Sequence, residues 1–243
     1  MVFPTRPMPR AFSPCVEIDA ELPLSRAVLG ELGVRGLQSG CGTTLRPGWL
    51  NSDWRALHDG DRDAGQPTVP GRLYRVMDDR YFIQHAVPEP FPIESDSLEW
   101  AFSEHFLEHL KPEDGIAWLA EMRRLLVPGG RVRVVVPDLR KFIVGYVDPS
   151  DSFMRQQAQA LASHFPDPAS LERPAFVVNS IFYEWGHKWM YDFDELRNAA
   201  IAAGFDASAV GQRGFREGRD QELAAFDLAE HAPDSLYVEI DNT

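Results

Sequence analysis

Apolar and polar positions along this chain recur with two different periods. Short runs that alternate or are continuously apolar predict strands, and apolar residues three and four positions apart predict helices. The predicted strands are 34–39, 49–53, 81–85, 98–102, 131–136, 207–213 and 235–240. The predicted helices are 21–32, 112–126 and 194–203. Because strands and helices alternate, the pattern predicts a mostly parallel sheet with helices on both faces.

Three stretches interrupt this alternation. Residues 1–20 are rich in proline and predict an N-terminal arm, and residues 55–72 are rich in Asp, Gly and Pro and predict a surface loop. Residues 139–190 combine helical stretches with many aromatic residues, which predicts a helical insert. We expect one domain over residues 1–243, with the insert at 139–190 acting as a lid over the substrate site.

Composition restricts the kind of protein and its partners. The 243 residues are 44% hydrophobic and 25% charged, which fits a globular protein that buries a core. The net charge of −13 disfavours nucleic acid and anionic membranes as partners. Two cysteines cannot form a disulfide framework, and no apolar run is long enough to cross a bilayer. We therefore expect a cytoplasmic protein.

A Gly-x-Gly turn follows the first strand predicted for the sheet. Gly40, Cys41 and Gly42 allow a tight turn and a close approach of the backbone to a ligand. The third glycine of a dinucleotide-binding turn is missing. Asp53 lies at the end of the next strand, where a carboxylate can accept hydrogen bonds from both ribose hydroxyls. Taken alone, the turn fits a ligand site and an ordinary connection equally well.

Three later segments resemble the class I S-adenosylmethionine-dependent methyltransferases, and most closely the predicted type 11 group. They are 91–110 (FPIESDSLEWAFSEHFLEHL), 121–132 (EMRRLLVPGGRV) and 186–192 (GHKWMYD), the last with Leu196 and 203–205. The resemblance covers roughly residues 33 to 240. It implies a Rossmann-like fold with a seven-stranded, mostly parallel sheet and a helical lid inserted before the sixth strand.

The resemblance also implies where S-adenosylmethionine binds. Gly40, Cys41 and Gly42 would face its methionine part and ribose, and Asp53 would hold the ribose hydroxyls. Adenine would contact Ala86 and Val87, and the methionine part would lie beside Ser103 and Glu104. Two positions depart from the family pattern, since Gln38 and Ala86 stand where acidic residues are common. Each removes one polar contact with the cofactor.

Three histidines are candidates for the base that removes a proton from a methyl acceptor. His105 and His109 lie four residues apart after the predicted strand 98–102, and His187 comes from the aromatic insert. A histidine titrates near neutral pH and therefore suits this task. Structural roles remain open for two of them: His109 could cap a helix or pack under the sheet, and His187 could be a contact of the lid.

The order His105-x-x-Glu108-His109 also resembles a metal-ligand pattern of inverted zincins. We expect no metal site here, because the segment follows a strand and leads to a Pro-Gly-Gly turn. A third ligand is also not evident from the sequence.

These observations predict a methyltransferase that uses S-adenosylmethionine, releases S-adenosylhomocysteine and methylates a hydroxyl of a small molecule or sugar. The alternatives are N-methylation and a methyltransferase fold that binds S-adenosylmethionine for another reaction. The aromatic insert also predicts a homodimer.

Overall fold

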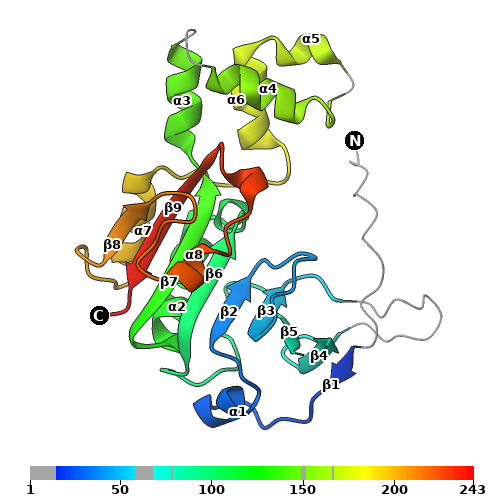
Figure 1. The fold of residues 1–243 in the computed structure, drawn as a ribbon, viewed down its shortest axis with the longest axis vertical. Coiled ribbons are helices and arrows are strands. Elements are labelled where there is room, and N and C mark those ends of the chain that lie inside the picture. The colour runs from blue at the N-terminus through cyan, green and yellow to red at the C-terminus, as the bar shows by residue number, and fades with distance from the viewer. Residues whose placement is uncertain (1–14, 58–67, 78, 149–151, 166) are drawn as a thin grey trace, which may run out of the picture.

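A nine-stranded mixed sheet runs through the molecule (Figure 1). The computed structural model describes residues 15–57, 68–77, 79–148, 152–165 and 167–243. In chain order the strands are β1 (Val16–Glu17), β2 (Gly36–Ser39), β3 (Trp49–Asp53), β4 (Leu73–Met77), β5 (Arg80–Gln84), β6 (Leu98–Glu104), β7 (Leu126–Pro137), β8 (Val210–Arg213) and β9 (Ser235–Asp241). Their order in the sheet is β1-β4-β5-β3-β2-β6-β7-β9-β8.

The central strands have the doubly wound arrangement. Strands β5, β3, β2, β6 and β7 are parallel, and their order reverses between β2 and β6. Strand β9 pairs antiparallel with β7 and with β8. The Rossmann-like α/β fold predicted from the sequence is confirmed.

Two strands add to the seven predicted ones at one edge of the sheet. Strand β4 forms an antiparallel pair with β5, and β1 pairs with β4. Val16 and Glu17 therefore belong to the sheet, although the sequence places them in the N-terminal arm. Residues 1–14 of that arm and residues 58–67 of the predicted loop lie outside the described residues.

Helices pack on one face of the sheet. They are α1 (Arg26–Glu31), α2 (Pro112–Leu125) and α7 (Phe193–Ala202). Helix α2 begins with a proline and two acidic residues in its first turn, as favoured at a helix N-terminus. It buries Trp118, Leu119, Met122 and Leu125 against the sheet. The helix runs directly into β7 at Leu126, whereas the sequence predicts a strand starting only after the Pro-Gly-Gly turn.

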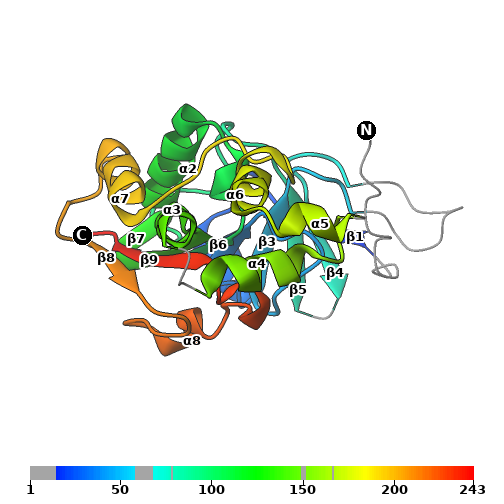
Figure 2. The ribbon, with the colours of Figure 1, turned by 90° about the horizontal axis from the view of Figure 1, so that it is seen from above.

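The opposite face is covered mainly by an irregular segment, residues 214–234, whereas the sequence predicts helices on both faces. This segment holds the short helix α8 (Gln221–Ala224) and the 3-10 turn η2 (Ala229–His231). Figure 2 shows α8 on the side of the sheet opposite α2 and α7. Trp49, Trp100 and Phe102 form a buried cluster on this face, to which the segment adds Leu223 and Phe226.

A buried ion network fastens this segment to the sheet. Arg133 of β7 is fully buried, and its guanidinium makes a bidentate contact with Asp227, at 2.7 Å from Nε to Oδ1 and 2.5 Å from Nη2 to Oδ2. It also donates to Glu239 of β9 at 3.1 Å. Charges taken out of water need such partners, so the network fixes the position of the segment.

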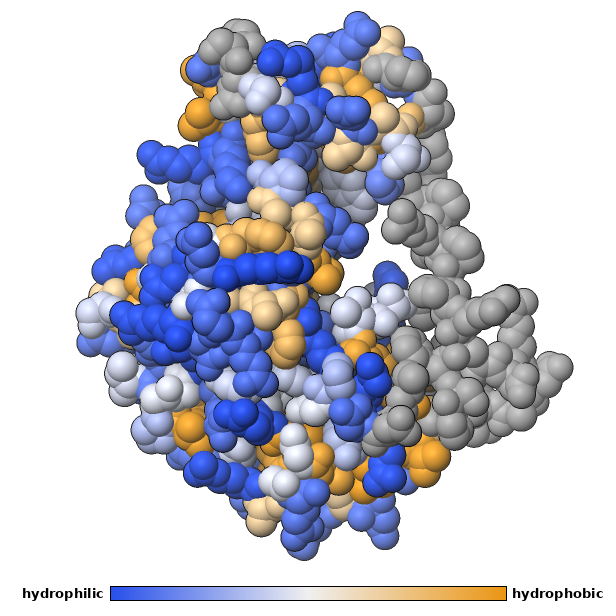
Figure 3. Space-filling view, viewed as in Figure 1, coloured by the Kyte–Doolittle hydropathy of each residue, from blue (hydrophilic) through white to orange (hydrophobic). Residues whose placement is uncertain are grey.

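Helices also run through residues 139–190, the predicted insert. It consists of α3 (Leu139–Val147), α4 (Phe153–Leu161), α5 (Pro168–Leu171) and α6 (Pro174–Tyr183). The four helices gather beyond the carboxyl end of β7 (Figure 1). Apolar side chains reach the surface of the insert (Figure 3), among them Val144 and Val147 of α3 and Phe182 of α6. The predicted homodimer and the predicted lid role both stay predictions.

Replacing Arg133 with alanine removes the cation that contacts the buried carboxylate of Asp227 and one of the two that contact Glu239, the other being Arg213. We expect Arg133→Ala to lower the free energy of unfolding by about 3–5 kcal/mol in urea denaturation. The matched control is Arg35→Ala, which removes an exposed ion pair with Glu99 and is expected to cost about 1 kcal/mol or less. Equal effects of the two substitutions would contradict a structural role for the buried network.

Candidate functional site

A cleft of about 580 Å³ opens at the carboxyl ends of the parallel strands. This volume lies within the roughly 300–1,000 Å³ typical of small-molecule sites. Its walls come from the ends of β2, β3, β5 and β6 and from the residues that follow α6. The lining residues are Ser39, Gly40, Ser52, Asp53, Trp54, Arg55, His85, Ala86, Val87, Phe91, His105, Phe106, His109, Leu110, Trp185, Gly186 and Lys188.

The turn after β2 forms the floor of the cleft. Gly40 has a φ of +68°, and a Cβ built on it would lie 2.6 Å from the Phe106 ring, so both conformation and space require glycine. The amide of Gly42 donates to Oδ2 of Asp53 at 3.0 Å, and the amide of Arg55 donates to Oδ1 at 2.9 Å. These bonds orient the Asp53 carboxylate and leave further lone pairs to accept hydrogen bonds from a ligand.

The residues expected to bind the cofactor separate into two groups. Gly40, Asp53, Ala86 and Val87 line the cleft. The other four, Cys41, Gly42, Ser103 and Glu104, are not among its lining residues.

Two of these four residues lie in other surroundings. The Cys41 side chain is buried in a cluster with Leu45 and Phe82, and burial raises the pKa of its thiol. Glu104 points to the face covered by residues 214–234, where Oε1 accepts from the amide of Leu228 at 3.0 Å. The same oxygen lies 3.3 Å from Nδ1 of His231.

His105 follows β6 in a left-handed conformation, with a φ of +49°. Its Nε2 lies 2.8 Å from the Ser235 hydroxyl and its Nδ1 lies 3.4 Å from Oε1 of Glu108. The ring lies against that of His231, with centroids 3.9 Å apart and the ring planes tilted by 32°. Burial, followed by the neighbouring histidines, holds the pKa of His105 well below its usual value. Both ring nitrogens therefore already face partners within the protein.

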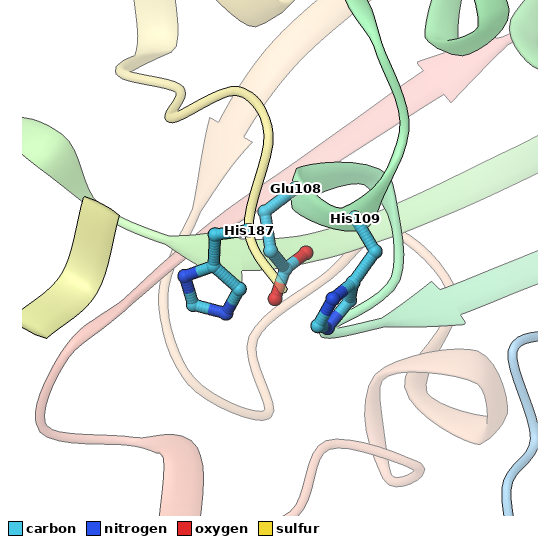
Figure 4. A group of neighbouring side chains, drawn as sticks. All are labelled: Glu108, His109 and His187. Atoms are coloured by element: carbon cyan, nitrogen blue, oxygen red, sulfur yellow. The ribbon is translucent and has the colours of Figure 1, made fainter. Parts of the chain in front are cut away.

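Glu108 and His109 lie on the 3-10 turn η1 (Leu107–His109), which is separated from His105 by Phe106. The end of the insert packs against this turn, since the amides of Lys188 and Trp189 donate to the Glu108 carbonyl at 2.7 and 3.2 Å. This contact brings His187 beside His109, with ring centroids 4.9 Å apart. Figure 4 shows the Glu108 carboxylate pointing between the two imidazoles.

Burial dominates the electrostatics of this group. It raises the pKa of Glu108 to about 8, and it lowers the pKa of His109 to about 4, with His187 as the next cause. Burial also lowers the pKa of His187, partly offset by a hydrogen bond to the Ile181 carbonyl. Both imidazoles are therefore uncharged at neutral pH and have lone pairs to offer.

The structure thus changes the histidine cluster expected from the sequence. The pattern His105-x-x-Glu108-His109 suggested one local group, but one ligand atom each from Glu108, His109 and His187 lie within 4.8 Å of one another. His187 is not among the lining residues of the cleft, whereas His109 is.

Sequence reasoning missed the two cations of the cleft, Arg55 and Lys188. Arg55 closely follows Asp53 at a strand end, which was a usable signal. Lys188 follows His187 in the insert, and only the packing of the insert on η1 brings it to the cleft.

Comparison with known proteins gives structural likenesses alone. No family model matches the chain, and neither does any curated protein. Among solved structures it is similar to the CurJ carbon methyltransferase (12% identity, TM-score 0.41), covering 87% of this chain and 49% of that chain. It is also similar to a possible histamine N-methyltransferase from Thermotoga maritima, with 16% identity and a TM-score of 0.43, covering 86% of this chain and 82% of that chain. A methyltransferase from Mesorhizobium loti is similar as well, with 18% identity and a TM-score of 0.43, covering 88% of this chain and 96% of that chain.

The chain thus spans about half the length of the first of these structures and most of the other two. Among the helices that the structure describes, none has the length and apolarity needed to cross a membrane.

The pair of His231 and Glu104 predicts a pH-dependent stability. Burial alone would lower the pKa of His231, but the hydrogen bond and charge of Glu104 outweigh it, so the pKa is raised. The contribution is therefore fully present below the pKa of an unfolded histidine, and it is lost as the pH rises through the higher folded value.

We expect the free energy of unfolding of the wild type to be higher than that of His231→Gln. This difference should be largest at pH 5.5 and smallest at pH 8.5. Urea titrations across this range measure the difference, with the exposed His164→Gln as control. A stability difference between wild type and His231→Gln that grows with pH would contradict the pairing of His231 with Glu104.

Proposed function

We propose that this chain is a methyltransferase that binds S-adenosylmethionine in the cleft and methylates a hydroxyl of a small molecule or sugar. One observation carries the proposal: a single cavity joins the turn at Gly40 and the Asp53 carboxylate to His109. The first part suits a nucleoside-bearing methyl donor, and the second suits an acceptor that must lose a proton.

The residues at the turn fit the donor. Asp53 lies in the cleft with its carboxylate oriented by the amides of Gly42 and Arg55, and it can still accept hydrogen bonds from ribose hydroxyls. Gly40 allows the close backbone approach that a ligand needs. Ala86 and Val87 give an apolar wall for adenine near the stacked rings of His85 and Phe91, whose centroids are 3.7 Å apart.

Methyl transfer requires the protein mainly to position the acceptor and to promote the loss of its proton. When bound, S-adenosylmethionine supplies a methyl group that its sulfonium charge already activates. The chain has to align the acceptor with it and help the acceptor lose its proton. Uncharged His109 lines the cleft and is well placed to promote this loss, and His187 and Glu108 lie beside it.

The cleft favours a hydroxyl over a cationic amine as acceptor. Arg55 and Lys188 both line it, and their charges repel an ammonium group and stabilise an alkoxide or phenolate. The exposed aromatic Trp185 offers a ring face for a sugar or an aromatic acceptor.

Removing the Asp53 carboxylate tests the donor site. We expect Asp53→Ala to weaken S-adenosylmethionine binding at least about tenfold in calorimetry, because charged hydrogen bonds contribute roughly 1.5–3 kcal/mol. Asp19→Asn, at an exposed acid that does not line the cleft, serves as control and should leave the affinity unchanged. Unchanged affinity in Asp53→Ala would place the cofactor elsewhere.

Release of S-adenosylhomocysteine with a panel of hydroxyl and amine acceptors tests the reaction and the histidines. We expect a hydroxyl acceptor to be turned over, and His109→Ala and His187→Ala each to lower turnover at least about tenfold. His105→Ala completes the series, and exposed His164→Ala is the control.

Transfer to amines alone would support N-methylation instead. Binding of S-adenosylmethionine without transfer to any acceptor would support a non-methylating role. If no histidine substitution lowers turnover, the histidines do not activate the acceptor.

A further inference from the structure

We propose that Glu108, His109 and His187 form a binding site for a divalent transition-metal ion of the Zn²⁺ type at the edge of the cleft. One ligand atom from each residue lies within 4.8 Å of the other two. The carboxylate and one imidazole come from neighbouring residues of η1, and the other imidazole comes from the end of the insert (Figure 4).

The Glu108 side chain is the strongest sign of a missing partner. It is fully buried, and neither carboxylate oxygen forms a hydrogen bond within the described residues. Oε1 lies 3.4 Å from Nδ1 of His105, and that ring already contacts the Ser235 hydroxyl through its other nitrogen. Burying a carboxyl group without compensation is costly. A cation held between Glu108 and the two imidazoles would supply the compensation.

Both imidazoles are held as metal ligands usually are. His187 donates from Nδ1 to the Ile181 carbonyl at 2.6 Å, which leaves Nε2 with its lone pair. The His109 ring faces the backbone of Gly186, whose influence raises its pKa and offsets part of the effect of burial. A hydrogen bond from one ring nitrogen to a carbonyl fixes the orientation of the ring and directs the other nitrogen to the metal.

The ligand set identifies the class of ion. Two histidines and one glutamate form the ligand set of several catalytic zinc sites, which keep an open position for water or substrate. Mg²⁺ and Ca²⁺ prefer oxygen ligands, so two imidazoles disfavour them. Ligands of a tetrahedral zinc ion lie about 3.3 Å apart, so binding would draw these three atoms closer together. His187 lies between α6 and α7, in a segment without helix or strand.

Such an ion would define how the acceptor is activated, an inference that rests on the proposed function. A hydroxyl coordinated to the ion would have a lower pKa and would lose its proton to water more readily. His109, bound to the ion, would have no lone pair left to act as a base. Activation by the ion therefore predicts that the metal-free protein has low turnover. Activation by His109 as a base predicts that the metal-free protein is active.

The test uses the tag-free full chain, stripped with EDTA and dialysed into chelator-free buffer. Calorimetric titration with Zn²⁺, and the visible absorption of Co²⁺ as a second probe, report binding without S-adenosylmethionine or an acceptor. We expect one ion per chain. Glu108→Gln, which keeps the shape of the side chain, and His187→Ala should each weaken binding at least about tenfold. His164→Ala, an exposed histidine outside the cluster, should bind like wild type.

Circular dichroism and thermal unfolding establish that each variant is folded. No binding by wild type, or binding that both substitutions leave unchanged, would overturn the site. Turnover by stripped protein that Zn²⁺ fails to increase would overturn the activating role alone. Intact Zn²⁺ binding by a chain that transfers no methyl group would contradict the proposed function and leave the site standing.

Discussion

The cleft exists because the winding of the sheet reverses between β2 and β6. From β2 the chain continues toward β3 on one side, and from β6 it continues toward β7 on the other. The two connections diverge at the carboxyl ends and leave a crevice between them. Ser39 pairs with Ser103 in register, so the turn at Gly40 and the residues after Glu104 emerge at the same level. The turn at Gly40 and the residues from His105 to His109 are placed by these two strand ends.

The parts of the fold that local patterns encode were predictable from the sequence. Strand β3 lies at residues 49–53 as predicted, and helix α7 deviates from its predicted bounds by one residue at each end. Strands β1 and β4 were missed because a two-residue strand and an edge hairpin depend on pairing with distant residues. The irregular cover of residues 214–234 was missed for a similar reason, since Arg133 holds it through charges that no periodicity reveals.

The candidate site was predictable where a residue's position along a strand decides its surroundings. Gly40 and Asp53 line the cleft because they lie at the ends of β2 and β3. For Glu104 the pleat matters as well. It shares a sheet face with Trp100 and Phe102, four and two residues earlier, and alternation along the strand therefore directs it away from the cleft. The meeting of His109 with His187 depends on how the insert returns to the sheet, which no spacing in the sequence contains.

The contact between the insert and η1 has a consequence for how this architecture can diversify. The amides of Lys188 and Trp189 donate hydrogen bonds to the carbonyl of Glu108, so the last residues of the insert are held against η1. Helices α4 and α5 lie earlier in the insert, and they pack mainly on each other and on α3 and α6. The insert therefore combines a helical body with an anchored end. A change in the length of its helices would leave the residues at the strand ends in place.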